Sequence, residues 1–189
     1  MNLKHLGDAL DHWKGSVIEL IGDKKLRVVP MLTDQGQWKQ EHFETYARLL
    51  HLKPEDVLKR DHLFSSQKRD DYFSDLGEHD LFLDPDKGIA PDKKAKKEHI
   101  KPSEIADLLK ESRSRMLLIY QHSSRKKDGF REKLNLLRST VSPKDRPMFA
   151  YDSGAVSMVV ISQSQKRIKE ASDRIHSCLG LVASARIIQ

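Results

Sequence analysis

The sequence is poor in cysteine and in long apolar runs, and these shortages exclude several classes of protein. Cys178 is the single cysteine in 189 residues, so the chain can form neither an internal disulfide nor a cysteine-based zinc site. No apolar run approaches the roughly 20 residues that span a bilayer. The first 15 residues contain no apolar segment followed by a cleavage signal. We therefore expect a soluble, cytoplasmic protein with no membrane partner.

Glycine-rich phosphate-binding motifs are also missing. Neither GxxxxGK[ST] nor GxGxxG occurs, which removes the usual nucleotide-binding loops. The GxSxG turn that carries the nucleophile of many serine hydrolases is absent as well. The sequence therefore contains none of the short motifs that would identify a common nucleotide-dependent enzyme or hydrolase.

Charge is what the sequence has in abundance. One third of all residues are charged, and 34 lysines and arginines against 28 acidic residues give a formal net charge of +6. A modest basic excess favours nucleic acid or another polyanion as a partner, although a charged surface that only keeps the protein in solution is the alternative. The pattern specifies no oligomeric state.

Helical and strand patterns alternate along the chain. Apolar residues at spacings of three and four, and the turn residues that end them, predict helices at 3–21, 38–51, 67–76, 102–109, 130–141 and 163–178. Short apolar runs predict strands at 26–32, 81–83 and 116–120, a hairpin across 148–162 and an edge strand at 185–188. We predict one α/β domain, residues 1–189, with a three-layer Rossmann-like sheet that is mainly parallel and carries a C-terminal antiparallel hairpin.

Polar side chains follow two successive strands of this predicted sheet. Asp84 and Asp86 come directly after one apolar run, and Gln121 and His122 come directly after the next. Ligands of open α/β sheets bind beyond the carboxyl ends of the strands, and sequential strands are neighbours about two times in three. We therefore expect these four side chains to converge. A plain turn ending at Gly88 is the alternative, because Asp, Pro and Gly all favour turns.

Two carboxylates and an imidazole at one sheet edge would permit two kinds of chemistry. Asp84, Asp86 and His122 are the candidate catalytic residues, as a general base and its partners. Alternatively, Asp84 and Asp86 would bind Mg²⁺ or Mn²⁺ through their oxygens, as in phosphoryl-transfer enzymes and nucleases.

Two basic segments follow the same two strands and should lie at the rim of the same edge. They occupy residues 93–97 and 125–127, where they could bind phosphates or simply remain solvated loops. The candidate substrate-binding residues are Gln121, Lys87, Lys93, Lys94, Lys96, Lys97, Arg125, Lys126 and Lys127. Residues 90–99 show no periodic pattern and are expected to form a loop, and Arg69 is expected on the solvated surface of a helix.

The residues around Asp84 carry a resemblance to known proteins. Residues 81–88, LFLDPDKG, followed by a helix and by the run 118–122, resemble an uncharacterised bacterial family with an FxDPDxG motif. That pattern is similar to the second half of class I S-adenosylmethionine-dependent methyltransferases that modify adenine. Their fourth strand ends in a D/N-P-P-Y/F motif, whose first two positions match Asp84 and Pro85. The later order of helix, strand, helix and hairpin is also similar.

The resemblance implies S-adenosylmethionine as a cofactor and nucleic acid as a substrate. On this comparison Asp84 would orient the reacting group, supported by His122 and Gln121. The chain departs from the family where Asp86 and Lys87 replace the second proline and the aromatic residue of the motif. It also lacks the family's glycine-rich turn after the first strand. A methyltransferase-like protein that acts on or binds nucleic acid, a metal-dependent nuclease and a non-catalytic binding protein therefore remain open.

Overall fold

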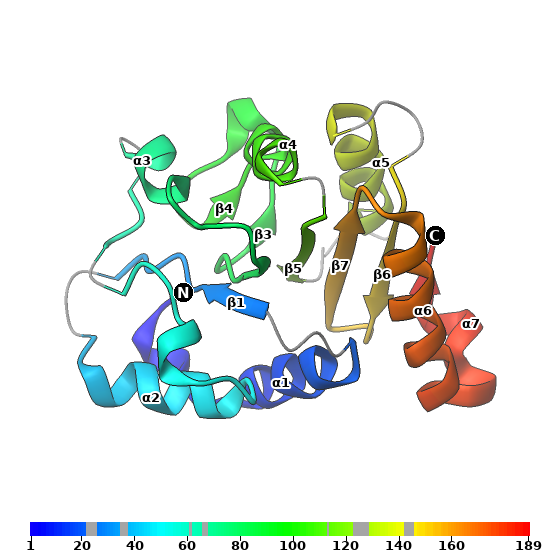
Figure 1. The fold of residues 1–189 in the computed structure, drawn as a ribbon, viewed down its shortest axis with the longest axis horizontal. Helices are drawn as coiled ribbons and strands as arrows, with labels where there is room; N and C mark the ends of the chain where they lie inside the picture. Colours follow the sequence, from blue (N-terminus) through cyan, green and yellow to red (C-terminus); the bar gives the residue numbers. More distant parts are fainter. Residues whose placement is uncertain are drawn as a thin grey trace.

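A computed structural model describes residues 1–21, 26–34, 38–60, 62–65, 68–112, 114–122, 129–141 and 146–189. A six-stranded sheet lies between two layers of helices, so the predicted three-layer α/β fold is confirmed (Figure 1). None of the helices in the described residues is long and apolar enough to cross a membrane.

The sheet combines a parallel half with an antiparallel half. Its strands, in spatial order, are β1 (Leu26–Val29), β2 (Asp80–Leu83), β5 (Met116–His122), β7 (Val156–Ser162), β6 (Met148–Asp152) and β8 (Ile187–Ile188). β1, β2 and β5 pair in parallel, whereas β7 runs antiparallel to both β5 and β6. Four strands, β1, β2, β5 and β6, therefore point one way, and β6 and β7 form the predicted C-terminal hairpin.

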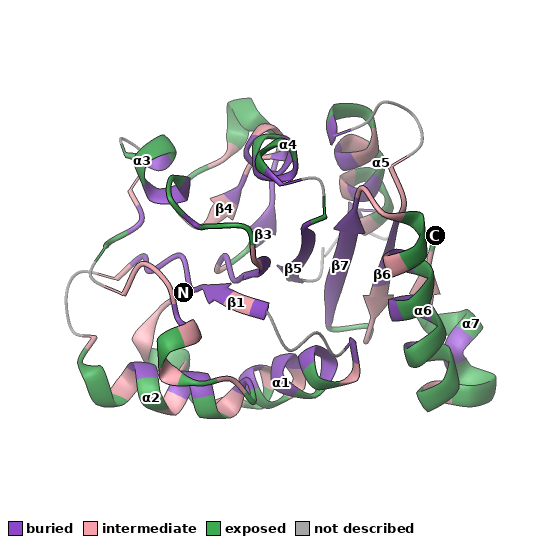
Figure 2. Cartoon of the chain, in the orientation of Figure 1, coloured by how far each residue is buried: buried purple, intermediate pink, exposed green. Residues whose placement is uncertain are grey.

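Two helix layers cover the two faces of this sheet. The helices are α1 (Ala9–Ile21), α2 (Gln40–Leu49), α3 (Arg69–Phe73), α4 (Pro102–Glu111), α5 (Gly129–Val141) and α6 (Gln165–Leu179). Phe82 and Leu118 pack in one core cluster with residues of α1, α2 and α6, whereas Leu81 and Leu117 pack in another with residues of α4 and α5. This alternation follows from the two-residue period of a strand. Both faces of the central strands are therefore buried, as Figure 2 shows in purple.

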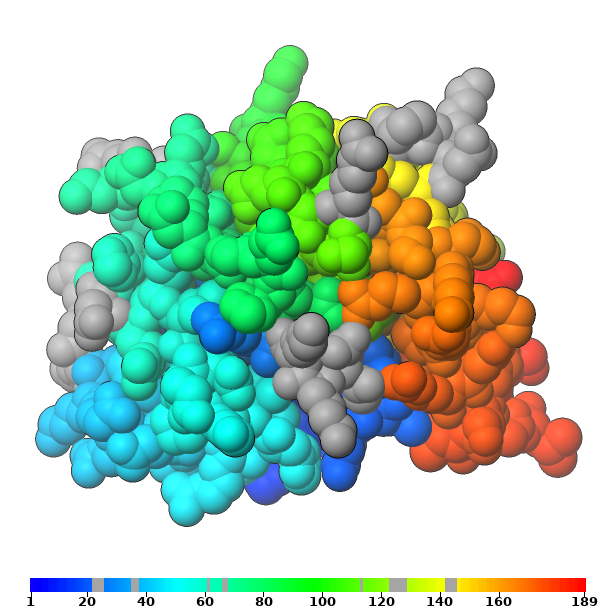
Figure 3. All heavy atoms as spheres, viewed as in Figure 1, coloured from blue at the N-terminus to red at the C-terminus, as the bar shows by residue number. Residues whose placement is uncertain are grey.

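Short elements complete the fold. They are the 3-10 turns η1 (Leu3–His5), η2 (Pro54–Asp56), η3 (Asp92–Lys94) and η4 (Gly180–Val182), the helical turn α7 (Ala183–Arg186), and the strands β3 (Gly88–Ile89) and β4 (His99–Ile100). β3 and β4 pair in parallel, so the prediction of a patternless loop at 90–99 is wrong at its C-terminal end. In the space-filling view, α2 and α6 lie towards opposite ends of the molecule (Figure 3).

Candidate functional site

The carboxyl ends of the parallel strands open into one cleft of about 570 Å³, which we call the strand-end cleft. Asp84, Asp86, Lys87, Lys97 and His122, all selected from the sequence, line this cleft. The prediction that the strands before Asp84 and His122 are neighbours is confirmed by the parallel pairing of β2 with β5. The N-terminal segment and α1 form the opposite wall.

Strand alternation decides which of the predicted side chains face the cleft. Asp84 follows Phe82 by two residues, and Phe82 packs towards α1 and α2. Tyr120 has the same orientation and also lines the cleft, as does His122 two residues later. Gln121 lies between them and points to the opposite face. The four polar side chains expected to converge are therefore divided between two faces of the sheet.

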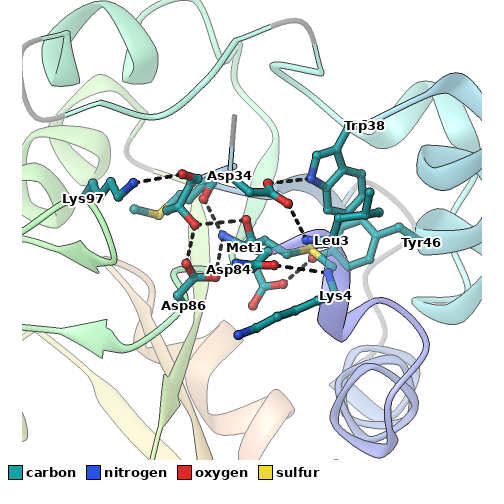
Figure 4. A network of polar contacts seen from close by, with 12 residues as sticks. Met1, Leu3, Lys4, Asp34, Trp38, Tyr46, Asp84, Asp86 and Lys97 are labelled. Carbon is teal, nitrogen blue, oxygen red and sulfur yellow. Dashed lines mark hydrogen bonds and ion pairs between the residues drawn. The ribbon is translucent and has the colours of Figure 1, made fainter. Parts of the chain in front are cut away.

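Asp84 is bound by two side chains from α1 and α2, the helices that pack on this face of the sheet. Its Oδ2 accepts hydrogen bonds from the Lys14 ammonium at 2.9 Å and from the Tyr46 hydroxyl at 2.5 Å. Lys14 also donates to Asp11 at 3.0 Å, and its Nζ lies 4.5 Å from the centre of the Tyr120 ring. Figure 4 shows Asp84 and Tyr46 in this network. Asp84 therefore serves first as the counter-ion of a buried lysine.

The protonation states in this cluster are fixed by burial and by charge. Burial lowers the pKa of Lys14, but the attraction of Asp84 and Asp11 outweighs burial and raises that pKa above its ordinary value. Burial and the negative charge of Asp84 raise the pKa of Tyr46. At neutral pH Lys14 is therefore charged and Tyr46 is protonated, so neither group can act as a general base.

Asp86 is also bound within the chain. The amino group of Met1 lies 2.8 Å from its Oδ1, and the Thr33 hydroxyl donates to Oδ2 (Figure 4). The carbonyl of Met1 accepts from the Thr33 backbone at 3.0 Å, and the Leu3 backbone donates to Asp34 at 2.6 Å. The N-terminal segment therefore packs into the space beyond β1. Where the resemblance implies a glycine-rich turn, the described residues Thr33 and Asp34 instead bond the backbone of Met1 and Leu3.

The same contacts bear on the metal alternative. Asp84 and Asp86 accept from different groups, the Lys14 ammonium and the amino group of Met1. Across the described ranges, no group of three or more His, Cys, Asp or Glu side chains is arranged to hold a metal ion. Each of the two carboxylates is therefore already paired with a positive charge of the chain.

Gln121 holds the small sheet in place. Its Oε1 accepts from the Ile89 backbone at 2.7 Å, and its Nε2 donates to the Lys87 carbonyl at 3.3 Å. The side chain is fully buried. Gly88 packs directly against it with φ = 85°, and a Cβ at this position would lie 2.5 Å from Oε1. The predicted substrate-binding residue Gln121 thus anchors β3 beside the cleft.

We expect Gly88→Ala to lower the free energy of unfolding by more than Gly7→Ala, as measured by urea denaturation. Both glycines have a positive φ, 85° and 84°, which costs an alanine about 1–2 kcal/mol. A Cβ on Gly7 meets nothing within 4 Å, whereas on Gly88 it overlaps Gln121 and adds about 1–3 kcal/mol. Equal losses for the two variants would show that the Gln121 contact is not tight.

Residues 93–97, which we call the lysine segment, are held against the domain. The Arg69 guanidinium donates to the carbonyls of Lys96 at 3.3 Å and His99 at 2.9 Å, and it pairs with Glu104 at 2.5 Å. Lys97 donates to the Thr33 carbonyl at 3.1 Å. The expectation that Arg69 is solvated surface is wrong, because the side chain is 6% exposed. The structure thus supports the lysine segment from two sides.

The other predicted basic residues have different positions. Lys93, Lys94 and Lys96 are exposed and lie outside the cleft lining. The second basic segment, Arg125, Lys126 and Lys127, lies outside the described residues.

Sequence reasoning missed Lys14, Tyr46 and Tyr120. Lys14 lies on the apolar stripe of α1, four residues after Leu10 and three before Val17, and it is buried. A charged residue at such a position needs a buried partner. This interruption of the stripe was the available signal, although it does not identify the partner.

Comparisons with protein-family models, with curated proteins and with solved structures found no significant match.

Proposed function

We propose that the protein is a methyltransferase-like α/β protein that binds nucleic acid across the rim of the strand-end cleft. The observation that carries the proposal is the lysine segment, which is exposed yet held beside the cleft by Arg69 and Lys97. Lysines that neutralise phosphates supply most of the affinity of sequence-independent nucleic-acid binding.

The lysines at the rim of the cleft are suited to binding a polyanion, because their positive charges are exposed and the segment that carries most of them is held in place. Lys87, Lys93, Lys94 and Lys96 are all exposed, and no ion pair to any of the four is found among the described residues. The backbone that carries Lys96 is bound by Arg69. Less conformational entropy is then lost on binding than for a mobile loop.

The methyltransferase likeness is part of the proposal at the level of architecture. The segment around Asp84 ends a central parallel strand and lines the cleft, followed by the helix, strand, helix and hairpin that the resemblance implies. Asp84 is occupied by Lys14, however, and the N-terminal segment fills the space beyond β1. We therefore propose binding of nucleic acid without a methyl-transfer step.

The test measures binding of labelled single-stranded and duplex oligonucleotides by fluorescence anisotropy at several salt concentrations. We expect the triple variant Lys93→Glu, Lys94→Glu, Lys96→Glu to bind at least about tenfold more weakly. The slope of log K against log salt should fall by about 2–3, because each lost phosphate contact removes about 0.7–0.9. The control for net charge reverses Lys110, Lys166 and Lys169, three exposed lysines of α4 and α6 whose ion pairs lie in solvent. Both triple variants change the formal net charge from +6 to zero.

The control distinguishes binding at the rim from binding that depends only on the net charge of the protein. Equal weakening in the two triple variants would contradict the rim, and failure of the unaltered protein to bind any oligonucleotide would overturn the proposal. Calorimetry with S-adenosylmethionine provides a second readout. We expect no heat of binding, whereas a signal that His122→Ala abolishes would restore the methyl-transfer hypothesis.

A further inference from the structure

A second pocket of about 500 Å³ lies beside the segment that follows β1, and we call it the tryptophan pocket. Trp38, Phe43, Arg60 and His62 are among the residues that line it. Its volume is within the range of pockets that bind small molecules. It therefore combines aromatic surface with two basic side chains, and none of the residues that line it also lines the strand-end cleft.

The aromatic part of this pocket is rigid. Trp38 stacks on Phe43 with ring centroids 5.1 Å apart and an interplanar angle of 27°, and it contacts Tyr46 edge-on at 6.3 Å. Its indole N–H donates to Asp34 at 2.8 Å, as Figure 4 shows. Because Asp34 holds the edge of the Trp38 ring and Phe43 packs against one side of it, the ring is a fixed surface on which a flat ligand can stack.

The basic part of the pocket has unused binding capacity. In the described part of the chain, neither Arg60 nor His62 has an ion pair or a side-chain hydrogen bond. His62 is exposed, and Arg60 is half-buried. A guanidinium in this position can bind an oxyanion through two parallel hydrogen bonds.

We propose that the tryptophan pocket binds one nucleotide unit, with its base stacked on Trp38 and its phosphate bound by Arg60 and His62. Stacking on an aromatic platform is how proteins bind unpaired bases with little dependence on sequence. The bases of a duplex are covered by their neighbours, so the ligand is a free nucleotide or a unit of a single strand. The single-strand version rests on the proposed function above.

The lysine segment and the tryptophan pocket adjoin each other along the chain that follows β1. Leu32 lines the pocket, and the next residue, Thr33, accepts a hydrogen bond from Lys97 through its carbonyl. Two adjacent residues, Leu32 and Thr33, therefore link the pocket to Lys97 of the lysine segment. This continuity favours a nucleotide within a strand over an unrelated small molecule.

The experiment uses the intrinsic fluorescence of Trp38. The chain has two tryptophans, so Trp13→Phe leaves Trp38 as the single reporter. Adenosine and thymidine monophosphates, ribose 5-phosphate and a single-stranded oligonucleotide are titrated in this background. We expect saturable quenching by ligands that contain a base, and a loss of affinity of about tenfold or more in Arg60→Ala. Arg48→Ala, an exposed arginine of α2 outside the pocket, is the matched control.

Each outcome decides between the alternatives. Quenching by free nucleotides supports a nucleotide pocket, and quenching by the oligonucleotide alone supports a site that requires the strand. The inference is overturned if the oligonucleotide binds by anisotropy while Trp38 fluorescence stays constant, and the proposed rim would then still stand. Quenching by free nucleotides without any oligonucleotide binding would support the proposed nucleotide pocket and contradict the proposed binding of nucleic acid at the rim. His62→Ala, at an exposed position, repeats the test should Arg60→Ala fail to fold.

Discussion

Replacing Lys14 with methionine is expected to lower the free energy of unfolding by about 3–5 kcal/mol, because removing one partner of a buried ion pair leaves an uncompensated charge. The side chains of Lys14 and Asp84 are 8% and 2% exposed, and Lys14 also neutralises Asp11. Methionine preserves most of the volume, so little of the loss comes from a cavity. Urea denaturation followed by circular dichroism gives the difference.

The control is a lysine whose ion pair is in solvent. Lys169 and Asp173 are 2.6 Å apart but 71% and 59% exposed, so Lys169→Met should cost less than about 1 kcal/mol. Adding Asp84→Asn to Lys14→Met should recover part of the loss, since it removes one of the two unpaired carboxylates. If Lys14→Met costs no more than Lys169→Met, the cluster below the cleft does not stabilise the fold.

The pH dependence of this loss has a definite sign. The pKa of Lys14 lies above its ordinary value of 10.5 in the folded protein, because Asp84 and Asp11 outweigh the opposing effect of burial. A raised pKa contributes stability below the unfolded value and loses it as the pH rises through the folded value. The contribution of Lys14 itself should therefore be constant from about pH 6 to about pH 9 and decline only in strong alkali.

The fold could be predicted from the sequence because local patterns of apolar and turn residues mark its strands and helices. The apolar runs before Asp84 and Gln121 are short and continuous, as expected for strands buried on both faces, and they pair in parallel. The hairpin at β6 and β7 was signalled by a glycine-containing turn. These elements depend on neighbouring residues, which is why the sequence was sufficient to predict them.

The site was predictable only in part, because contacts across the chain decide it. Lys14 and Asp84 are 70 residues apart, and no local pattern links them. Gln121 was grouped with His122 because both follow one strand, yet alternation turns Gln121 towards β3. Arg69 was expected at the surface because the residues around it are charged. Its guanidinium is instead buried, and hydrogen bonds to Glu104 and to two backbone carbonyls compensate for the loss of water.

Arg69→Ala is expected to release the lysine segment and to weaken nucleic-acid binding. Arg69 supplies two hydrogen bonds to Glu104 and one each to the carbonyls of Lys96 and His99. Its loss leaves the carboxylate of Glu104, which is 9% exposed, without its counter-ion, and we expect a cost of about 3–5 kcal/mol. Amide hydrogen exchange should report this as lost protection at Ala90, whose N–H bonds the Ile100 carbonyl.

The location of the effect distinguishes a released segment from general unfolding. Amides of the central strands β2 and β5 should keep their protection in Arg69→Ala under conditions where Ala90 exchanges freely, since local opening is independent of the core. Arg69→Lys should not restore the segment, because one ammonium cannot reproduce the planar fork that reaches Glu104 and both carbonyls. Arg131→Ala, an exposed arginine of α5, is the control. Should Arg69→Ala lose Ala90 protection yet bind oligonucleotides as tightly as the unaltered protein, the lysines act from a mobile segment. The fixed rim proposed here would then be wrong.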